Sequence, residues 1–224
     1  MKIEEKKKLR TVKNEEQQPF SLVLDQAPEQ ANLQLADPSL LLYYQHLQDR
    51  RIFINEDITE AVNEYCQQIL LWNAEDEKYS RPVEERQPIK IFVYTYGGDL
   101  NACLSLCNFI QMSKTPVYTY NQGIAYSAGA IILLAGHKRF ALPDSTTLIH
   151  EGSASFSGTA DEVKQAQKEY EEKINKMKSF ILSHSKIDEE LFNKNRKKDW
   201  YIRGEQQLEC GIIDEIVSDI TKLI

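Results

Sequence analysis

Long apolar runs, a dinucleotide-binding glycine motif and a phosphate-binding loop are all missing from this sequence of 224 residues. The longest apolar stretch, near residues 123–136, is too short and too rich in glycine and alanine to span a bilayer. Because neither G-x-G-x-x-G nor G-x-x-x-x-G-K-[ST] occurs, we expect neither a nicotinamide site nor ATP hydrolysis by this chain. No apolar segment follows the opening MKIEEKKKLR, which predicts no secretory signal. We expect a cytoplasmic protein with no membrane partner.

An excess of positive charge is also absent. The formal net charge is −7, from 34 acidic residues against 27 lysines and arginines. Binding to phosphates needs a clustered basic surface, so nucleic acid is not an expected partner. Hydrophobic residues make up 42% of the chain and charged residues 27%, which is typical of a globular protein with a real core.

Cysteine is scarce, with four residues at positions 66, 103, 107 and 210. Cys103 and Cys107 lie four residues apart on a predicted helix and could present two thiolates on one face. The sequence has no further cysteine pair beside these two and no histidine pair at zinc spacing. We therefore expect buried free thiols, as in a reducing compartment, with no metal and no cofactor.

The pattern along the chain predicts a polar N-terminal extension over residues 1–36, interpreted as a mobile arm, and one folded domain over residues 37–224. Helical periodicity is clear between Ala61 and Leu70, and the charged stretch 73–88 is interpreted as an exposed loop. Other helices are predicted near 39–49, 100–112, 160–184 and 188–194, after Ser127 and from residue 204; strands are predicted near 51–54, 89–96, 115–121, 138–142, 146–150 and 200–202. Such alternation predicts an α/β fold with a largely parallel central sheet.

Ser127 lies among small residues in the stretch NQGIAYSAGAIILLAG, where an apolar helix begins. A helix N-terminus leaves backbone N–H groups unpaired, and these could hold an oxyanion that develops beside the serine oxygen. Small neighbours would let a substrate carbonyl approach the hydroxyl. Serine is also a favoured N-cap residue, and this stretch alone favours the N-cap interpretation.

A glycine pair in YTYGGDL stands between a predicted strand and a predicted helix and could supply a second oxyanion donor, although turns use glycine pairs often. A nucleophilic serine needs a base and a group that orients the base. His150 ends an apolar strand at the edge where α/β sheets place their sites. The other histidines lie on amphipathic helices or in a turn: His46, His184 and His137. Spacing alone cannot select one carboxylate from 34.

Taken together, these motifs resemble the proteolytic subunit of the ATP-dependent Clp protease, a serine peptidase. The resemblance covers roughly residues 39–217 and is carried by YGGDLNA, GIAYSAGA, ALPDSTTLIH and RKKDWYIRGEQQLECGIIDEI. It implies the fold shared by Clp proteases and crotonases, with stacked strand–helix repeats. A protruding handle helix would lie at about residues 160–184.

The resemblance also implies a catalytic triad. Ser127 would attack the peptide carbonyl, His150 would move the proton, and Asp199 would orient the imidazole. The backbone N–H groups of Gly98 and Ala128 would form the oxyanion hole.

Assembly and partners follow from the same resemblance. We expect two stacked heptameric rings of identical subunits around a chamber, with a separate AAA+ unfoldase that consumes ATP and feeds in unfolded polypeptides. The positions that match the unfoldase-docking pockets are Phe92, Met112, Tyr120 and Phe140. Ordinary packing of these four side chains is an equally good interpretation.

The chain departs from the family pattern beside its motifs. Thr95-Tyr96 replaces Ser-Pro, Ala128 replaces a large apolar residue, and Glu151-Gly152 replaces Gln-Pro. Substrate preference, partner and ring size therefore stay open. So do three alternatives: a low-activity scaffold or regulatory ring subunit, a phage-type maturation protease, and a crotonase-like acyl-CoA hydratase or isomerase. Enzymes of the last kind rely on glutamates and do not need the serine and histidine pair.

Overall fold

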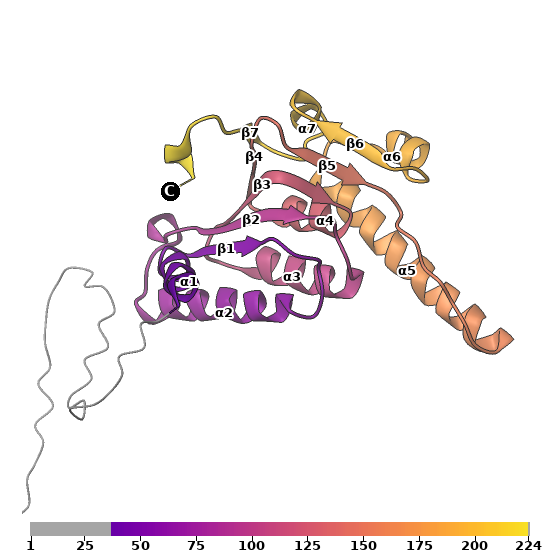
Figure 1. The fold of residues 1–224 in the computed structure, drawn as a ribbon, viewed down its shortest axis with the longest axis horizontal. Coiled ribbons are helices and arrows are strands. Elements are labelled where there is room, and N and C mark those ends of the chain that lie inside the picture. Colours follow the sequence, from indigo (N-terminus) through magenta and orange to yellow (C-terminus); the bar gives the residue numbers. More distant parts are fainter. Residues whose placement is uncertain (1–36, 224) are drawn as a thin grey trace, which may run out of the picture. The chain divides into compact units, whose positions relative to one another are not determined.

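A seven-stranded sheet organises the domain formed by Pro38–Ile224 (Figure 1). The computed structural model describes residues 37–223, so the predicted N-terminal extension lies outside the described residues. The strands are β1 (Arg51–Ile54), β2 (Ile89–Thr95), β3 (Val117–Tyr126), β4 (Lys138–Ala141), β5 (Thr146–Ile149), β6 (Trp200–Arg203) and β7 (Glu215–Ile216). The helices are α1 (Pro38–Gln48), α2 (Val62–Lys78), α3 (Leu100–Met112), α4 (Ala128–Ala135), α5 (Ala160–His184), α6 (Glu189–Asn195) and α7 (Glu205–Glu209), with short 3₁₀ turns at Val83–Glu85 and Ile220–Lys222.

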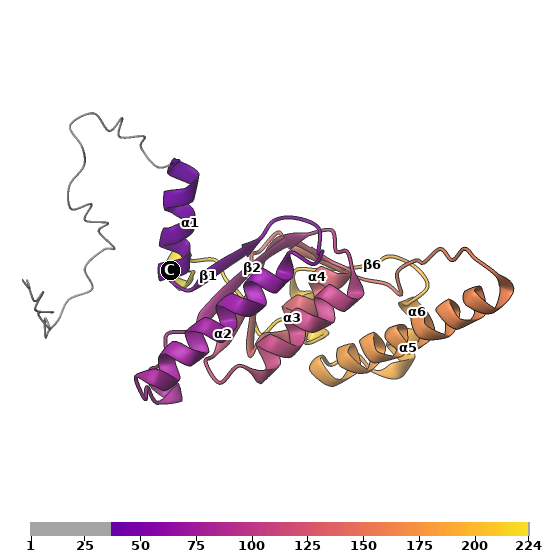
Figure 2. The ribbon, with the colours of Figure 1, turned by 90° about the horizontal axis from the view of Figure 1, so that it is seen from below.

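The strands run in the order β1-β2-β3-β4-β7, and every pair along this path is parallel. β3 is long enough to branch: its first half pairs with β4, and its second half pairs in parallel with β5. β6 is antiparallel to β5. Helices α2, α3 and α4 lie on one side of the sheet, and α5 extends away from it (Figures 1 and 2). The predicted α/β class with a largely parallel sheet and a protruding helix is confirmed. Within residues 37–223, no helix is long and apolar enough to cross a membrane.

The strand predicted at 115–121 continues to Tyr126, so the prediction was too short. Asn121 and Gly123 indicated an end to the strand, because both residues are uncommon in strands. In the structure, the Asn121 amide is buried and donates to the Thr146 carbonyl oxygen at 3.1 Å and to Thr147 Oγ1 at 3.2 Å. Pairing with β5 thus outweighs the local preference and carries the strand up to Ser127.

The loop predicted at 73–88 was wrong for its first six residues, because α2 continues to Lys78. The reason is Asp76, which is fully buried although the residues beside it are charged. Arg50 donates two hydrogen bonds to its carboxylate, at 2.6 and 2.8 Å, and Thr115 and Arg81 donate one each at 2.8 and 2.9 Å. This cluster joins the start of β1 and the approach to β3 to the end of α2.

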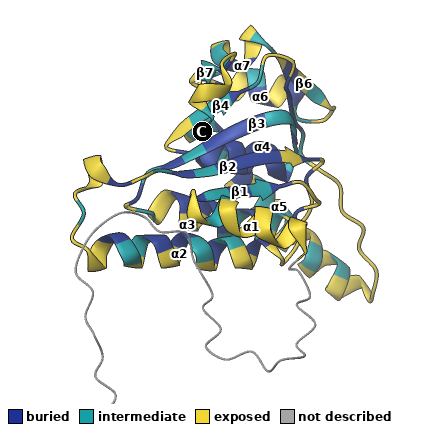
Figure 3. Ribbon diagram, turned by 60° about the vertical axis from the view of Figure 1, so that its left-hand side comes forward, coloured by how far each residue is buried: buried dark blue, intermediate teal, exposed yellow. Residues whose placement is uncertain are grey.

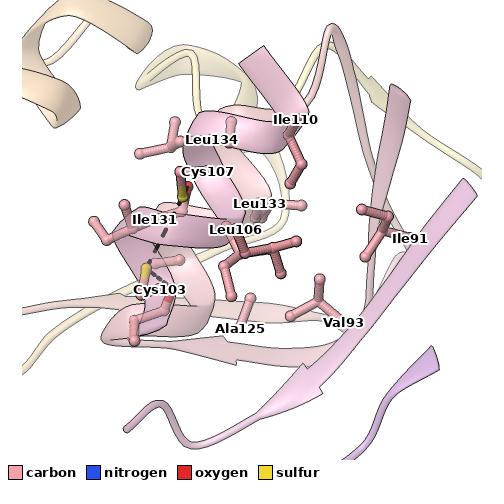
Figure 4. Close-up of a cluster of buried hydrophobic side chains, with 14 of the residues drawn as sticks. Ile91, Val93, Cys103, Leu106, Cys107, Ile110, Ala125, Ile131, Leu133 and Leu134 are labelled. Atoms are coloured by element: carbon pink, nitrogen blue, oxygen red, sulfur yellow. Dashed lines mark hydrogen bonds between the residues drawn. The ribbon is translucent and has the colours of Figure 1, made fainter. Parts of the chain in front are cut away.

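The core is densest around α4, where all eight residues are buried (Figure 3). A Cβ added to Gly129 would lie 2.5 Å from Thr95 Cγ2, so glycine lets this helix approach the sheet closely. On the other side α3 packs against it, with Cys103 Sγ 3.2 Å from the Ala128 carbonyl oxygen and Cys107 Sγ 3.6 Å from that of Ile131 (Figure 4). Cys66 is buried as well, whereas Cys210 is half-buried. Burial raises the pKa of the Cys107 thiol, which keeps it protonated.

Replacing Asp76 with Asn is expected to lower the free energy of unfolding by about 3–5 kcal/mol, because buried Arg50 would lose its anion. Burial alone would raise the pKa of Asp76, but the hydrogen bonds from Arg50, Thr115 and Arg81 outweigh it and hold that pKa well below its usual range. The stabilisation should therefore be full above about pH 4 and be lost as the pH falls through the folded pKa.

Denaturant titration of both forms between neutral and acid pH measures this effect. Glu64→Gln, on the exposed side of the same helix, is the matched control and should change stability by no more than about 0.5 kcal/mol. Equal stability of Asp76→Asn and Glu64→Gln would show that the ion pair contributes nothing.

Candidate active site

Ser127 stands between β3 and α4 in an unusual backbone conformation, with φ of 52° and ψ of −116°. Such a conformation costs a non-glycine residue roughly 1–3 kcal/mol and is held by its surroundings. Here the Ser127 N–H donates to the Leu148 carbonyl oxygen of β5 at 2.9 Å. Ser127 is the N-cap residue of α4 by position, as the sequence indicated, but its side chain makes no capping hydrogen bond. Its Oγ instead lies 2.9 Å from His150 Nε2.

His150 and Asp199 are brought together by the β5–β6 pairing. Ile149 is the register partner of Trp200. His150 directly follows the first strand and Asp199 directly precedes the second, so an antiparallel ladder sets them side by side. Nδ1 of the imidazole lies 3.0 Å from Asp199 Oδ1. The histidine is about one-third exposed and the aspartate about one-half.

The glycine pair forms the turn beside the serine, with φ of 112° at Gly97 and 145° at Gly98. A Cβ on Gly97 would lie 2.8 Å from Ser127 Cβ, and one on Gly98 would lie 2.2 Å from the Ile58 carbonyl oxygen. Ile58 fixes the turn from the other side: its N–H donates to Gly97 O, and its carbonyl accepts from Asp99 N–H, both at 2.7 Å. Glycine is therefore required here both for conformation and for space.

A cleft of about 400 Å³ lies beside Ser127. Gly98, Ser127, Ala128 and His150 form one wall, and Asp199 lies behind the histidine. The opposite wall comes from the middle of α5 and includes Tyr170, Lys173, Ile174 and Met177. The structure thus brings together all five residues proposed for the triad and the oxyanion hole.

A larger cleft of about 870 Å³ lies around Arg139 and His184. This cleft also contains a serine in contact with a histidine, but Ser183 and His184 are adjacent in the sequence, both on α5. The other nitrogen of the His184 ring contacts the side-chain amide of Gln111, where a catalytic triad would have a carboxylate. Arg139 is occupied by a two-pronged ion pair with Asp214. The larger of these two clefts is therefore not the better candidate for the active site.

Three of the four residues at the predicted docking positions are neighbours. Rings stack across β1 to β4 in one aromatic ladder, at centroid distances of 4.7 to 4.8 Å. The ladder consists of Phe53, Phe92, Tyr120 and Phe140. Met112 is not part of it: this residue ends α3, on the helical side of the sheet, and is 81% exposed. The docking role of these positions stays a prediction.

Sequence reasoning missed the contacts around Glu151. Its N–H donates to the Arg196 carbonyl oxygen at 2.9 Å, and its carboxylate forms an ion pair with the Arg196 guanidinium. The Tyr170 hydroxyl donates to the Glu151 carbonyl oxygen at 3.1 Å. Glu151, next to His150, is thereby bound to Arg196, which lies three positions before Asp199. No periodicity or motif in the sequence relates Glu151 to Arg196.

A serine, a histidine and a carboxylate in one hydrogen-bonded series, beside a glycine turn, have the arrangement found in serine hydrolases. The sequence model of the Clp protease family matches residues 37–219. Proteolytic subunit 2 of the ATP-dependent Clp protease from Rhodococcus jostii is 29% identical over 191 residues, which cover 84% of this chain and 92% of that protein. Subunit 2 from Treponema denticola is 30% identical over 181 residues (80% and 86%), and the Deinococcus radiodurans subunit is 28% identical over 179 residues (79% and 84%).

The chain therefore belongs to the Clp protease family, as its motifs predicted. Its activity is that of a serine-type endopeptidase.

Arg196→Met is expected to slow the reaction of Ser127 with a fluorophosphonate by about 10-fold, because small displacements of a catalytic base are costly. Arg196→Lys, which keeps the charge, should recover much of the rate. The rate is read from the intact mass of the adduct over time. Lys178→Met breaks a comparable ion pair between α5 and α6, with Glu189, and serves as the control. Equal rates for Arg196→Met and Lys178→Met would contradict this role of Glu151 and Arg196.

Proposed function

We propose that this chain cleaves internal peptide bonds of unfolded polypeptides through Ser127, His150 and Asp199. The observation that carries the proposal is the continuous series from Ser127 Oγ to His150 Nε2, 2.9 Å, and from Nδ1 to Asp199 Oδ1, 3.0 Å. An acyl-CoA enzyme of related fold would have no use for this series, and a scaffold would not need to keep it aligned.

Each group has one task in the proposed mechanism. Ser127 Oγ attacks the carbonyl carbon while His150 Nε2 takes its proton, and Asp199 accepts the Nδ1–H bond that fixes the tautomer. The imidazolium then gives the proton to the leaving amine, which breaks the peptide bond and leaves an ester on Ser127. Water, deprotonated by the same imidazole, hydrolyses that ester and restores the serine.

The oxyanion of each tetrahedral intermediate would be held by the N–H groups of Gly98 and Ala128. Support comes from the position of both residues on the wall of the cleft beside Ser127 and from the start of α4 at Ala128, where the helix dipole is positive. Losing one such donor costs on the order of 3 kcal/mol in the transition state. The proposed mechanism uses no metal and no cofactor.

We also propose that residues 37–224 form the peptidase domain of a cytoplasmic homo-oligomer of stacked heptameric rings. The curated relatives are named proteolytic subunits of an ATP-dependent protease, which supports a separate AAA+ unfoldase as partner. A contact with further chains is supported by α1, which has no buried residue and exposes five large apolar side chains in a row. These are Leu40, Leu41, Leu42, Tyr43 and Tyr44. The aromatic ladder is the proposed unfoldase-docking region, with Met112 on another surface.

Labelling with a fluorophosphonate tests the nucleophile. The purified full chain should gain the mass of a single adduct, and Ser127→Ala should gain none, because only a serine activated by its histidine reacts quickly. Intact mass spectrometry gives the result. A folded protein that gains no adduct, or a variant that still gains one, would refute Ser127 as the nucleophile.

Asp199→Asn tests the third member separately. Cleavage of a quenched peptide should fall by roughly 10³–10⁴-fold, because an amide stabilises the wrong imidazole tautomer. Glu190→Gln, an exposed acidic residue of α6, is the matched control and should cleave at the original rate. A loss below about 10-fold in Asp199→Asn would remove that residue from the triad.

A further inference from the structure

Three tyrosines form a continuous row beside the site: Tyr96, Tyr126 and Tyr201, here called the tyrosine row. The ring centroids of Tyr96 and Tyr126 are 5.8 Å apart, as are those of Tyr126 and Tyr201, and both pairs meet edge to face at 76° and 83°. Tyr96 is 70% exposed and Tyr201 41% exposed, while Tyr126 between them is half-buried. Large aromatic side chains are thus presented to solvent in a fixed arrangement.

The strand register explains why the three rings share one face. Tyr126 is the register partner of Leu148, and Leu148 is the partner of Tyr201, so these side chains point to the same side of the sheet. Leu148 is only 5% exposed, and the two tyrosine rings meet across it. One position earlier, Thr95 pairs with Ala125. Tyr96 and Tyr126 are therefore neighbours where these strands end.

The row is also held from its two ends. The Arg203 guanidinium lies over the Tyr201 ring, 5.0 Å from its centroid. At the other end Tyr96 follows Tyr94 and Thr95 on β2, and the Thr95 hydroxyl accepts from the Gly97 N–H at 3.1 Å, which fixes the backbone on either side of Tyr96. Burial and the neighbouring Tyr201 raise the pKa of Tyr126, so its phenol is uncharged at neutral pH. The result is an aromatic surface with a guanidinium at its Tyr201 end.

This surface is continuous with the catalytic cleft. Tyr96 directly precedes Gly97 and lines the cleft together with Ser127 and His150. Tyr126 directly precedes Ser127, and Tyr201 follows Asp199 by two positions. An endopeptidase cuts within a chain, so the substrate must leave the serine in two directions. Of the three tyrosines Tyr96 lines the cleft, and Tyr126 and Tyr201 continue the row beyond the lining residues.

We propose that the tyrosine row binds apolar and aromatic side chains of the substrate polypeptide on one side of the bond that is cut. The proposal rests on the proposed function, since it assumes that Ser127 cleaves internal peptide bonds. Unfolded chains expose the apolar side chains that a folded protein buries, and tyrosine rings offer them contact area at a low cost in side-chain entropy. The row would thus favour cleavage beside apolar segments and disfavour glycine- and serine-rich ones.

The test measures binding apart from catalysis, in the full chain carrying Ser127→Ala. The probes are two fluorescein-labelled ten-residue peptides with the same central dipeptide, one flanked by phenylalanine and leucine and the other by glycine and serine. Fluorescence anisotropy should show tighter binding of the apolar-flanked peptide. Adding Tyr96→Ala or Tyr201→Ala should weaken that binding by about 2- to 10-fold each and leave the glycine- and serine-flanked peptide unchanged.

Two further variants and two readouts make the outcomes distinct. Tyr201→Phe should bind like the parent, and Tyr79→Ala removes another exposed tyrosine, at the end of α2, as the control. In chains that keep Ser127, the parent and Tyr79→Ala should react with a fluorophosphonate at the same rate. Unchanged peptide binding in Tyr96→Ala and Tyr201→Ala overturns the proposal. So does a changed assembly mass in sedimentation with no loss of peptide preference, which would make the row a contact between copies. Retained peptide preference with no Ser127 adduct would overturn the proposed function and leave the binding surface standing.

Discussion

The parallel pairing of β5 with the second half of β3 is the constraint on which the site depends. It supplies the Leu148 carbonyl oxygen that holds the Ser127 backbone in its unusual conformation, and it delivers His150 to the hydroxyl of the same serine. Because β6 pairs with β5, the same strand also fixes Asp199. One short strand thus positions a serine, a histidine and a carboxylate that come from three separate segments.

The core around α4 makes this arrangement stiff. A buried helix cannot shift to relax the strain at Ser127, since it is packed between the sheet and α3, with cysteine thiols against its first turns. The glycine turn closes the site from the side of β2, where neither glycine could be replaced without moving Ser127 or Ile58. Strain at a reactive serine is maintained only when the surroundings leave no alternative conformation, and this condition is met here.

Sequence reasoning predicted the α/β class, most elements, and the residues that the structure assembles into the cleft. Periodicity and the glycine turn predicted the helices and strands. The resemblance to a known family selected Asp199, whereas spacing alone could not select one carboxylate. Three features could not be predicted. The extension of β3 through Asn121 depends on pairing with β5, and the helical conformation around Asp76 depends on a buried arginine 26 positions earlier. The tie between Glu151 and Arg196 joins residues 45 positions apart that share no motif. Each arises from contacts that only the folded chain makes.

The hydrogen-bonded series also joins three separate segments of the chain. Ser127 meets His150 across 23 positions, and His150 meets Asp199 across a further 49. Within the described sheet, β6 pairs only with β5. Loss of the β5–β6 pairing would therefore release Asp199 and leave Ser127 and His150 together, since these two are held by the β3–β5 pairing.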